Sequence, residues 1–435
     1  MLAAMSTAPL PPSSRAIAVS RDRDDACPGS LRLHTADDGA LARVRVPGGV
    51  LTVPQAEALA DAADRLGDGE LHLTSRGNVQ LRGLRGDCGA RLAELLDAAG
   101  LLPSHGHERA RNIVASPLSG LDGRGVREVR PWLSALDGAL CASEAARALS
   151  GRFLFALDDG RGDVAGLGAD VTVRALADGG ALLAVGSAER ALRVSGEEAP
   201  RAALLAAETF LDVRRKTGEQ VWRIDELSVS SGELTRTVGS RLTGAGIGCV
   251  PVPNDRATAG GPPPGVTGAA LSVHVPLGRL TSRQWRTVTR VAAGVRSGEL
   301  RLTPWRGIVV PVPGTDVAAT AGALARLAGA GLVTDASSPW LRVGACIGRP
   351  GCGRSRSDVR ADAAGALADA DRSSLPLYWS GCERRCGHPR GDRIDVVAAP
   401  EGGYRVEAVV RGRPARTAAL DDPSHLAAAL AAVTP

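Results

Sequence analysis

The sequence is poor in lysine and in aromatic residues. Lys216 is the only lysine among 52 basic residues, so the others are arginines, and aromatic residues make up 3% of the chain. No apolar run approaches the roughly 20 residues that a membrane-spanning helix needs. No polybasic run is interleaved with aromatics, as nucleic-acid binding would require. We therefore expect neither a membrane nor a nucleic acid as partner.

Features of secretion are also missing. Residues 1–27 mix prolines, serines and charges and lack the continuous apolar segment of a signal peptide. We expect a disordered leader over these residues and a cytoplasmic location. Eight cysteines in 435 residues are too few for a disulfide scaffold. Four of them are scattered, and the other four form two pairs: Cys346 with Cys352, and Cys382 with Cys386.

The chain repeats itself. Residues 44–74 align without a gap to residues 273–303, which lie 229 positions later, and 13 of the 31 aligned positions are identical. Each copy predicts a strand, a turn, a helix and a second strand, because apolar residues recur first at alternate positions and then at helical spacing. A repeat of this length predicts two fused, domain-sized halves.

The segments that follow the two copies also correspond, more loosely, and a Pro- and Gly-rich stretch separates the halves. We expect a mixed α+β fold around a pseudo-twofold axis, with a cleft for one large ligand. The expected order is a leader (1–27), a small module (28–103), a larger module (104–252), a linker (253–268), a second small module (269–335) and a second larger module (336–435).

The paired cysteines point to a metal centre. They follow the pattern C-x5-C, then 29 residues, then C-x3-C. Four thiolates suit either tetrahedral zinc or an iron–sulfur cluster. Structural zinc prefers tighter knuckles, whereas the glycines and proline of "IGRPG" give a loop that can wrap around a larger cube. The pattern favours a cluster, and a zinc-stabilised binding protein or a simple electron carrier remains as an alternative.

This cysteine pattern, late in a twofold-repeated chain, resembles the nitrite/sulfite reductase family. The resemblance covers roughly residues 28–430 and includes "LTSRGNVQLRG" in the first copy and "LTPWRGIVV" in the second. It implies two ferredoxin-like half-modules and two α+β modules. It also implies a [4Fe–4S] cluster on Cys346, Cys352, Cys382 and Cys386, and a tetrapyrrole of the sirohaem type in the central cleft.

The basic residues of that family's anion site are only partly present. By position, Arg76 and Arg111 match two arginines of the family, whereas Arg152 and Leu154 stand at two lysine positions. Reduction of sulfite or nitrite needs several protons delivered to the anion, and arginine and leucine are poor donors. The site is still suited to hold a carboxylated ring, because guanidinium groups match carboxylates.

The branch of the family that departs in this way comprises the precorrin-3B synthases of aerobic cobalamin biosynthesis, which "ACPGSLRLH" and "YWSGCERRCGHP" also resemble. This implies a monooxygenase that hydroxylates precorrin-3A at C20 with dioxygen and an electron donor and closes a γ-lactone. It also implies a mononuclear non-haem iron, for which we find no 2-His-1-carboxylate spacing. The alternative is a sulfite or nitrite reductase, and sirohaem is a cofactor only in that case.

The candidate ligand-contacting residues come from both halves. Trp305 stands in the second copy where Arg76 stands in the first, so the two halves differ at the turn expected to face the cleft, and packing is an equally good role for this tryptophan. His388 is expected to be solvated or hydrogen-bonded. No catalytic residue is predicted, and a monomer is expected. The full set of candidates is Arg76, Asn78, Arg111, Asn112, Arg152, Trp305 and Arg306.

Overall fold

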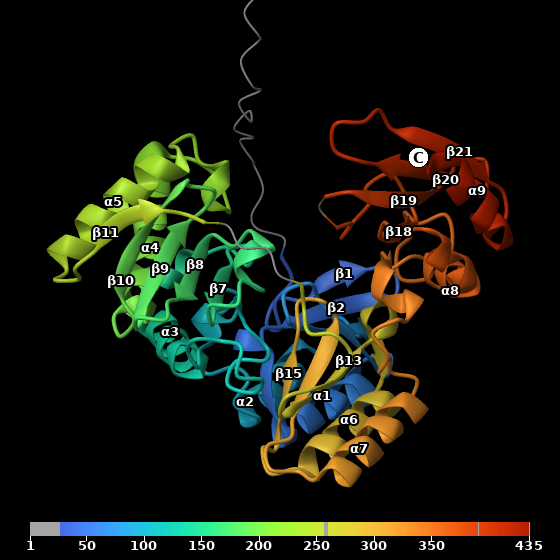
Figure 1. Cartoon of the computed structure of the whole chain (residues 1–435), viewed down its shortest axis with the longest axis horizontal. Coiled ribbons are helices and arrows are strands. Elements are labelled where there is room, and N and C mark those ends of the chain that lie inside the picture. The colour runs from blue at the N-terminus through green and yellow to red at the C-terminus, as the bar shows by residue number, and fades with distance from the viewer. Residues whose placement is uncertain (1–26, 256–259, 390, 435) are drawn as a thin grey trace, which may run out of the picture.

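The computed structural model describes residues 27–255, 260–389 and 391–434 (Figure 1). Its strands form four sheets, one for each small module and one for each larger module, with helices packed on them. This confirms the duplicated α+β fold. The expected leader lies outside the described residues except for Cys27, whose side chain is buried. No helix of the described residues is long and apolar enough to cross a bilayer.

The two small modules have the same order of elements. The first consists of β1 (His34–Ala36), β2 (Gly39–Val44), β3 (Val50–Thr52), α1 (Val53–Leu66), β4 (Glu70–Leu73), β5 (Val79–Leu84) and α2 (Gly89–Ala98). The second consists of β12 (Gly265–Thr267), β13 (Ala270–His274), β14 (Arg279–Thr281), α6 (Ser282–Ala293), β15 (Glu299–Leu302), β16 (Gly307–Pro311) and α7 (Val317–Gly329).

The two small modules exchange a strand. One sheet has the order β1-β2-β5-β4-β14 and the other the order β12-β13-β16-β15-β3, so each sheet takes its last strand from the other copy. Thr281 pairs with Glu70 and Thr52 pairs with Glu299, and the two pairs are related by the 229-residue offset of the repeat. The exchange makes one joint sheet-and-helix core from two copies of one sequence.

The helix that follows each exchanged strand begins in the same way. The side chain of Thr52 accepts a hydrogen bond from the backbone N–H of Gln55, and the Gln55 side chain accepts one from the backbone N–H of Thr52. Thr281 and Gln284 form the same capping box. This reciprocal bonding satisfies donors that would otherwise lack partners in the first turn. The identical residues of the repeat therefore include those that start its helix.

Helices α1 and α6 pack against each other across the pseudo-twofold axis. Trp285 of α6 is fully buried, and its indole N–H donates a hydrogen bond of 2.8 Å to the carbonyl oxygen of Ala56 in α1. Beside it, Arg286 forms ion pairs with three acidic residues of α1: Glu57, Asp61 and Asp64. Both apolar and charged contacts hold the halves together.

The larger modules flank the small ones on opposite sides (Figure 1). In each, three parallel strands are followed by antiparallel ones. The first holds β6 (Ile113–Ala115), α3 (Arg130–Ala142), β7 (Phe155–Asp158), β8 (Val171–Ala175), β9 (Gly180–Val185), β10 (Arg190–Ser195), α4 (Ala199–Thr217), α5 (Ser231–Gly244) and β11 (Val250–Pro253). The second holds β17 (Val343–Ala345), α8 (Val359–Gly365), β18 (Leu377–Ser380), β19 (Arg393–Ala398), β20 (Tyr404–Val409), β21 (Arg416–Leu420) and α9 (Leu426–Val433).

The loops after the first two parallel strands are joined by an equivalent hydrogen bond in both larger modules. In the first, the backbone N–H of Asp159 donates to the hydroxyl of Ser116 at 3.1 Å. In the second, the backbone N–H of Gly381 donates to the thiol sulfur of Cys346 at 3.3 Å. Ser116 and Cys346 each follow directly on their strand, β6 and β17. A serine in the first module therefore occupies the place of a predicted cluster ligand in the second.

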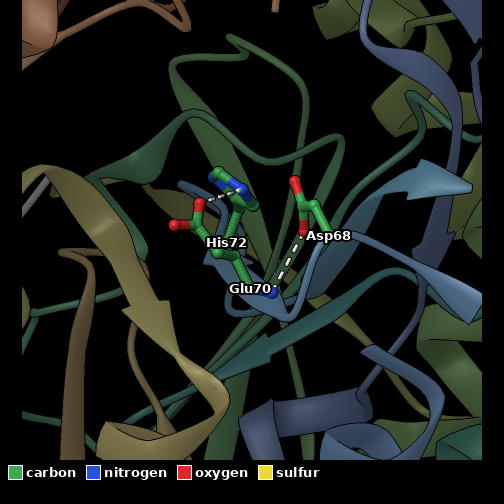
Figure 2. A group of neighbouring side chains, drawn as sticks. All are labelled: Asp68, Glu70 and His72. Carbon is green, nitrogen blue, oxygen red and sulfur yellow. Dashed lines mark hydrogen bonds and ion pairs between the residues drawn. The ribbon is translucent and has the colours of Figure 1, made fainter. Parts of the chain in front are cut away.

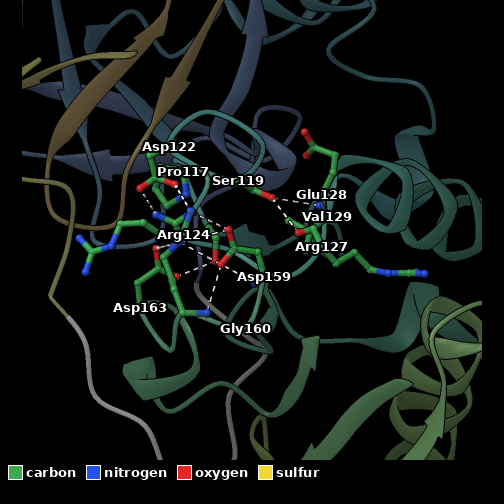
Figure 3. A network of polar contacts seen from close by, with 12 residues as sticks. Pro117, Ser119, Asp122, Arg124, Arg127, Glu128, Val129, Asp159, Gly160 and Asp163 are labelled. Carbon is green, nitrogen blue, oxygen red and sulfur yellow. Dashed lines mark hydrogen bonds and ion pairs between the residues drawn. The ribbon is translucent and has the colours of Figure 1, made fainter. Parts of the chain in front are cut away.

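In the first larger module these loops are joined by charge (Figure 3). Arg161 binds both carboxylate oxygens of Asp122 at 2.8 and 2.9 Å and also pairs with Asp159 at 2.7 Å. Ser116 donates to Asp163 at 2.6 Å. Burial, with a further contribution from the charge of Asp158, raises the pKa of Asp163 to about 7.

We expect Trp285→Ala to lower the free energy of unfolding by about 3–5 kcal/mol, because it removes a fully buried indole from the interface of the two copies. Chemical denaturation followed by circular dichroism measures this change. Arg283→Ala, on the exposed side of the same helix, is the matched control. Equal denaturation midpoints for the two variants would show that the α1–α6 contact does not hold the halves together.

We also expect Asp163→Asn to change how stability depends on pH. The raised pKa means that the folded state binds this proton more tightly than the unfolded state, so its stabilising contribution is present below about pH 4 and is lost as the pH rises through about 7. The amide keeps the acceptor oxygen for Ser116 and avoids the buried charge. Relative to the wild type, the variant should gain on the order of 1–3 kcal/mol between pH 5 and 8.

Urea denaturation across that pH range provides the measurement, with the exposed Asp87→Asn as control. Parallel stability curves for Asp163→Asn and the wild type would contradict the assignment.

Candidate functional site

A cavity of about 680 Å³ lies where all four modules meet. This is within the range of about 300–1,000 Å³ that is usual for small-molecule sites. Both copies of the repeat and both larger modules contribute to its walls. The lining includes Ser75, Arg76, Leu154, Arg223, His274, Trp305, Arg306, Arg342, Tyr378 and His388, together with residues 261–264 from the segment between the halves.

The wall of the cavity is cationic. Its described lining includes four arginines and two histidines, and none of the described lining residues is aspartate or glutamate. Arg223 pairs with Asp170 at 2.6 Å, and Arg342 pairs with Asp371. Among the described residues, the other two, Arg76 and Arg306, have no carboxylate partner. A site of this kind attracts anions, and its guanidinium groups are suited to bind carboxylates.

Arg76 lies in the turn between β4 and β5, where the sequence predicts a turn. One of its terminal nitrogens donates to the carbonyl oxygens of Gly151 and Arg152, at 3.4 and 3.1 Å. Burial, and then the positive charges of Arg223 and Arg45, lower its pKa to about 10. Arg76 therefore remains a cation at neutral pH. Because its charged neighbours include other arginines, a bound anion would be stabilised at this position.

Arg306 lies in the corresponding turn of the second copy, between β15 and β16. Its backbone adopts a left-handed conformation, with φ at 58°. Its N–H donates to Thr303, and its carbonyl oxygen accepts from Val275, so that the turn is held on both sides. A non-glycine residue in this region costs free energy and is common at functional sites.

The remaining candidates lie outside the cavity lining, apart from Trp305. The amide of Asn78 donates to Asn112 at 2.9 Å, the amide of Asn112 donates to a backbone carbonyl, and both side chains are buried. Arg111 binds both oxygens of Asp137, each at 2.7 Å. The guanidinium of Arg152 stacks over Trp222, 4.3 Å from the ring centre. Their contact with a ligand stays a prediction, and only Arg76, Trp305 and Arg306 of the seven line the cavity.

Sequence reasoning missed several lining residues. His274 is equivalent to Arg45 under the repeat offset, and burial, followed by the charge of Arg306, lowers its pKa to about 4, so that its imidazole is neutral. Tyr378 alternates with Leu377 and Trp379, which belong to the core, so the pattern of its strand places it on the opposite face. For Arg223 and Arg342, neither the repeat nor the alternation of a strand indicates that they would face the cavity.

The four paired cysteines come together at one end of the second larger module. Cys346 follows β17, Cys382 follows β18, and these neighbouring strands run parallel, so both residues lie at the same edge of the sheet. Burial raises the pKa of the Cys386 thiol, and the charges of Cys382 and Cys346, and to a smaller extent that of Cys352, raise it further. The sulfur of Cys386 is therefore within electrostatic range of the other three.

The four thiols suit an iron–sulfur cluster by ligand type, and their spacing does not match a single zinc ion. Among the described residues, which include all four, no three of these sulfurs lie within 4.8 Å of one another. Tetrahedral zinc, with Zn–S bonds of about 2.3 Å, would hold its sulfurs about 3.8 Å apart. The Gly381 N–H bonded to the Cys346 sulfur is a typical contact of a cluster loop. The residues present fit an iron–sulfur cube.

The loop that carries Cys352 is held by the first small module. The backbone N–H of Gly353 donates to Asp37 at 2.6 Å, and Arg82 donates to the carbonyl oxygen of Gly351 at 2.8 Å. Arg82 is itself fixed by Asp38. One cysteine loop in the C-terminal module is thus positioned by residues about 270 to 316 positions earlier in the chain.

Figure 2 shows a second group of metal-ligating residue types, none of which is among the residues that line the cavity. Asp68, Glu70 and His72 bring their ligand atoms within 4.8 Å of one another. Burial, and then Arg360, Arg82 and Arg279, lower the pKa of His72 to about 2. Both oxygens of Glu70 are bound by Arg279. Because its glutamate is already paired and the group does not line the cavity, it does not fit an iron that would act on a bound ligand.

Comparison with known proteins gives the same fold and relatives of the expected kind. The nitrite/sulfite reductase ferredoxin-like half domain matches residues 34–99 and 264–327, which are the two small modules. A precorrin-3B synthase of Sinorhizobium sp is 26% identical over 98% of this chain and 92% of its own length. The ferredoxin–nitrite reductase of Synechococcus elongatus is 28% identical over 85% of this chain and 78% of its own.

Among solved structures, the NirA protein of Mycobacterium tuberculosis aligns with a TM-score of 0.68 at 17% identity, covering 89% of this chain and 79% of that one. This likeness shows a shared fold. The repeated half domain, the relatives along most of the chain and the common architecture agree with one another. The chain is therefore similar to nitrite reductases and to a precorrin-3B synthase along most of its length, and its two small modules match the nitrite/sulfite reductase ferredoxin-like half domain.

Proposed function

We propose that this protein is an oxygen-dependent monooxygenase of the precorrin-3B synthase type. It would hydroxylate precorrin-3A at C20 and close a γ-lactone from the ring A acetate. The observation that carries the proposal is the cavity between the four modules, which is walled by arginines, has no carboxylate among its described lining residues and lies beside four clustered cysteines. The precorrin-3B synthase relative, aligned over 98% of the chain, supports the same function.

The cavity suits a metal-free ring that carries many carboxylates. Arg76 and Arg306 come from equivalent turns of the two copies, so they can bind acetate or propionate groups on different sides of one ligand. Trp305 and Tyr378 offer apolar faces to the macrocycle. In this arrangement the chain's own residues bind and orient the substrate and limit the access of water to it.

The same lining argues against reduction of sulfite or nitrite. A six-electron reductase needs proton donors beside the bound anion. The described lining contains no lysine, and Leu154 occupies one of the two lysine positions of the family. Arg152, at the other, is stacked over Trp222. A sirohaem-dependent reductase is therefore the weaker reading, although a nitrite reductase is among the relatives.

We assign a [4Fe–4S] cluster to Cys346, Cys352, Cys382 and Cys386, and the gathering of the other three thiols around Cys386 supports this assignment. When bound, such a cluster supplies one-electron transfer, and dioxygen and an electron donor are the other expected partners. A mononuclear iron is not placed, because the group around His72 does not suit it. The cytoplasmic location, the monomeric state and the domain boundaries stay predictions.

We expect Arg76→Gln and Arg306→Gln each to weaken the binding of precorrin-3A about ten- to hundredfold, because a charged hydrogen bond to a carboxylate is worth about 1.5–3 kcal/mol. Anaerobic equilibrium titration gives the dissociation constants without turnover. Arg283→Gln, on the exposed surface of α6, is the matched control. Wild-type affinity in both cavity variants would show that the ring binds elsewhere.

We expect anaerobically purified protein to contain one [4Fe–4S] cluster and no sirohaem, and to convert precorrin-3A only after oxygen is admitted. Mass spectrometry of the product should show the addition of one oxygen atom. Absorption spectra separate the alternatives, because sirohaem has strong visible bands, whereas a cluster gives a broad brown shoulder. Turnover at the same rate without oxygen would refute the monooxygenase, and sirohaem bands with nitrite reduction would establish the alternative.

A further inference from the structure

One side chain joins the ligand cavity to the cysteine cluster. Tyr378 lies in β18, between β17 and β19, with its ring on the side of the sheet away from the core residues Leu377 and Trp379. It is 3% exposed and lines the cavity. Its hydroxyl donates a hydrogen bond of 2.7 Å to the carbonyl oxygen of Cys386. The phenol therefore spans from the cavity wall to the backbone of a predicted cluster ligand.

Two glycines make room for this ring. Gly344 of β17 pairs with Tyr378 of β18, and a Cβ atom on Gly344 would lie 2.9 Å from the tyrosine ring. A Cβ atom on Gly387, directly after Cys386, would lie 2.8 Å from the hydroxyl, and Gly387 has a φ of 84° that favours glycine. Larger residues at either position would push the ring out of place. The loop is therefore built closely around the tyrosine.

Arg306 connects this tyrosine to the cationic wall. Its guanidinium lies close to Gly344 of β17, as the ring of Tyr378 does. A Cβ atom on Gly344 would be 3.3 Å from a terminal nitrogen of Arg306. Arg306 is also one of the two cavity arginines without a carboxylate partner among the described residues. A ligand carboxylate bound to Arg306 would therefore lie next to the phenol that holds the Cys386 peptide.

We propose that Tyr378 is a positioning residue that transmits the occupancy of the cavity to the Cys386 end of the cluster. The inference rests on the proposed function and names the residue that couples its two sites. A ligand that moves the ring or Arg306 changes the hydrogen bond to Cys386 and so the surroundings of its sulfur. Hydrogen bonds and backbone around a cluster tune its electronic properties.

The test is Tyr378→Phe, which removes the hydroxyl and keeps the ring in the wall. The matched control is Tyr404→Phe: Tyr404 is the other tyrosine of the chain, belongs to the core of the same module, and donates to Asp362 instead of to a cysteine loop. Both variants and the wild type are prepared anaerobically, and their iron and sulfide contents are measured. Electron paramagnetic resonance spectra of the reduced cluster are then recorded with and without precorrin-3A.

In the wild type and in Tyr404→Phe, we expect precorrin-3A to change the cluster spectrum. In Tyr378→Phe, we expect precorrin-3A to bind with an affinity within about twofold of the wild type but to leave the spectrum unchanged, and kcat to fall about ten- to hundredfold with KM little altered, as for a misplaced group. A ligand-induced change of wild-type size in Tyr378→Phe would overturn the proposal.

Failure of the proposed function is distinguishable from failure of this inference. If wild-type protein does not bind precorrin-3A, the function is wrong, and the ligand-free spectra still decide whether Tyr378 acts on the cluster. In that case, a ligand-free spectrum and midpoint potential altered in Tyr378→Phe but not in Tyr404→Phe would support the contact. Identical ligand-free properties in all three proteins would overturn it. Loss of the cluster from Tyr378→Phe alone would support a positioning role for the hydroxyl.

Discussion

The reciprocal exchange of one short strand is the constraint on which the rest of the structure depends. β3 completes the sheet of the second copy and β14 completes that of the first, so neither small module has a whole sheet without the other. The shared core, with Trp285 buried between α1 and α6, fixes the two copies around one axis. Because each larger module follows its small module in the chain, the same axis places all four around one cavity.

Duplication also relates the predicted cluster site to its counterpart in the first larger module. Ser116 and Cys346 occupy equivalent positions and accept equivalent backbone hydrogen bonds. In the first module the two loops are held together by Arg161 and its carboxylate partners, and in the second four cysteines gather at the same place. Equivalent loops are thus joined by ion pairs in the first larger module, whereas in the second they carry thiols suited to a cluster.

Much of the fold could be predicted from the sequence, because the repeat is strong locally. The helix expected in each copy is present, and the matched residues 52, 55, 281 and 284 form its capping box. The expected turn around Arg76 is present between β4 and β5. The strand exchange could not be read in this way, since a strand of three residues fits the sheet of either copy. The spacing of the paired cysteines in the sequence was enough to predict a shared site. The structure gives the reason: the two pairs follow neighbouring parallel strands, whose ends lie at the same edge of the sheet.

The lining of the cavity was predicted less well. Arg111 and Arg152 were chosen by their place in motifs, but their orientation is set by Asp137 and Trp222, which lie far enough along the chain to leave no local sign. Arg223 and Arg342 enter the wall through tertiary packing alone. What the arginine-rich composition did indicate is the chemistry of the wall: a surface of guanidinium groups suited to carboxylates.

The central claim is that this wall holds an acidic macrocycle beside an iron–sulfur cube, and an anaerobic crystal structure with precorrin-3A tests it most directly. The account predicts a cube on the four paired cysteines and a metal-free ring in the cavity, with its carboxylates on Arg76 and Arg306. A ring bound outside the cavity, or a single zinc ion on the cysteines, would contradict it.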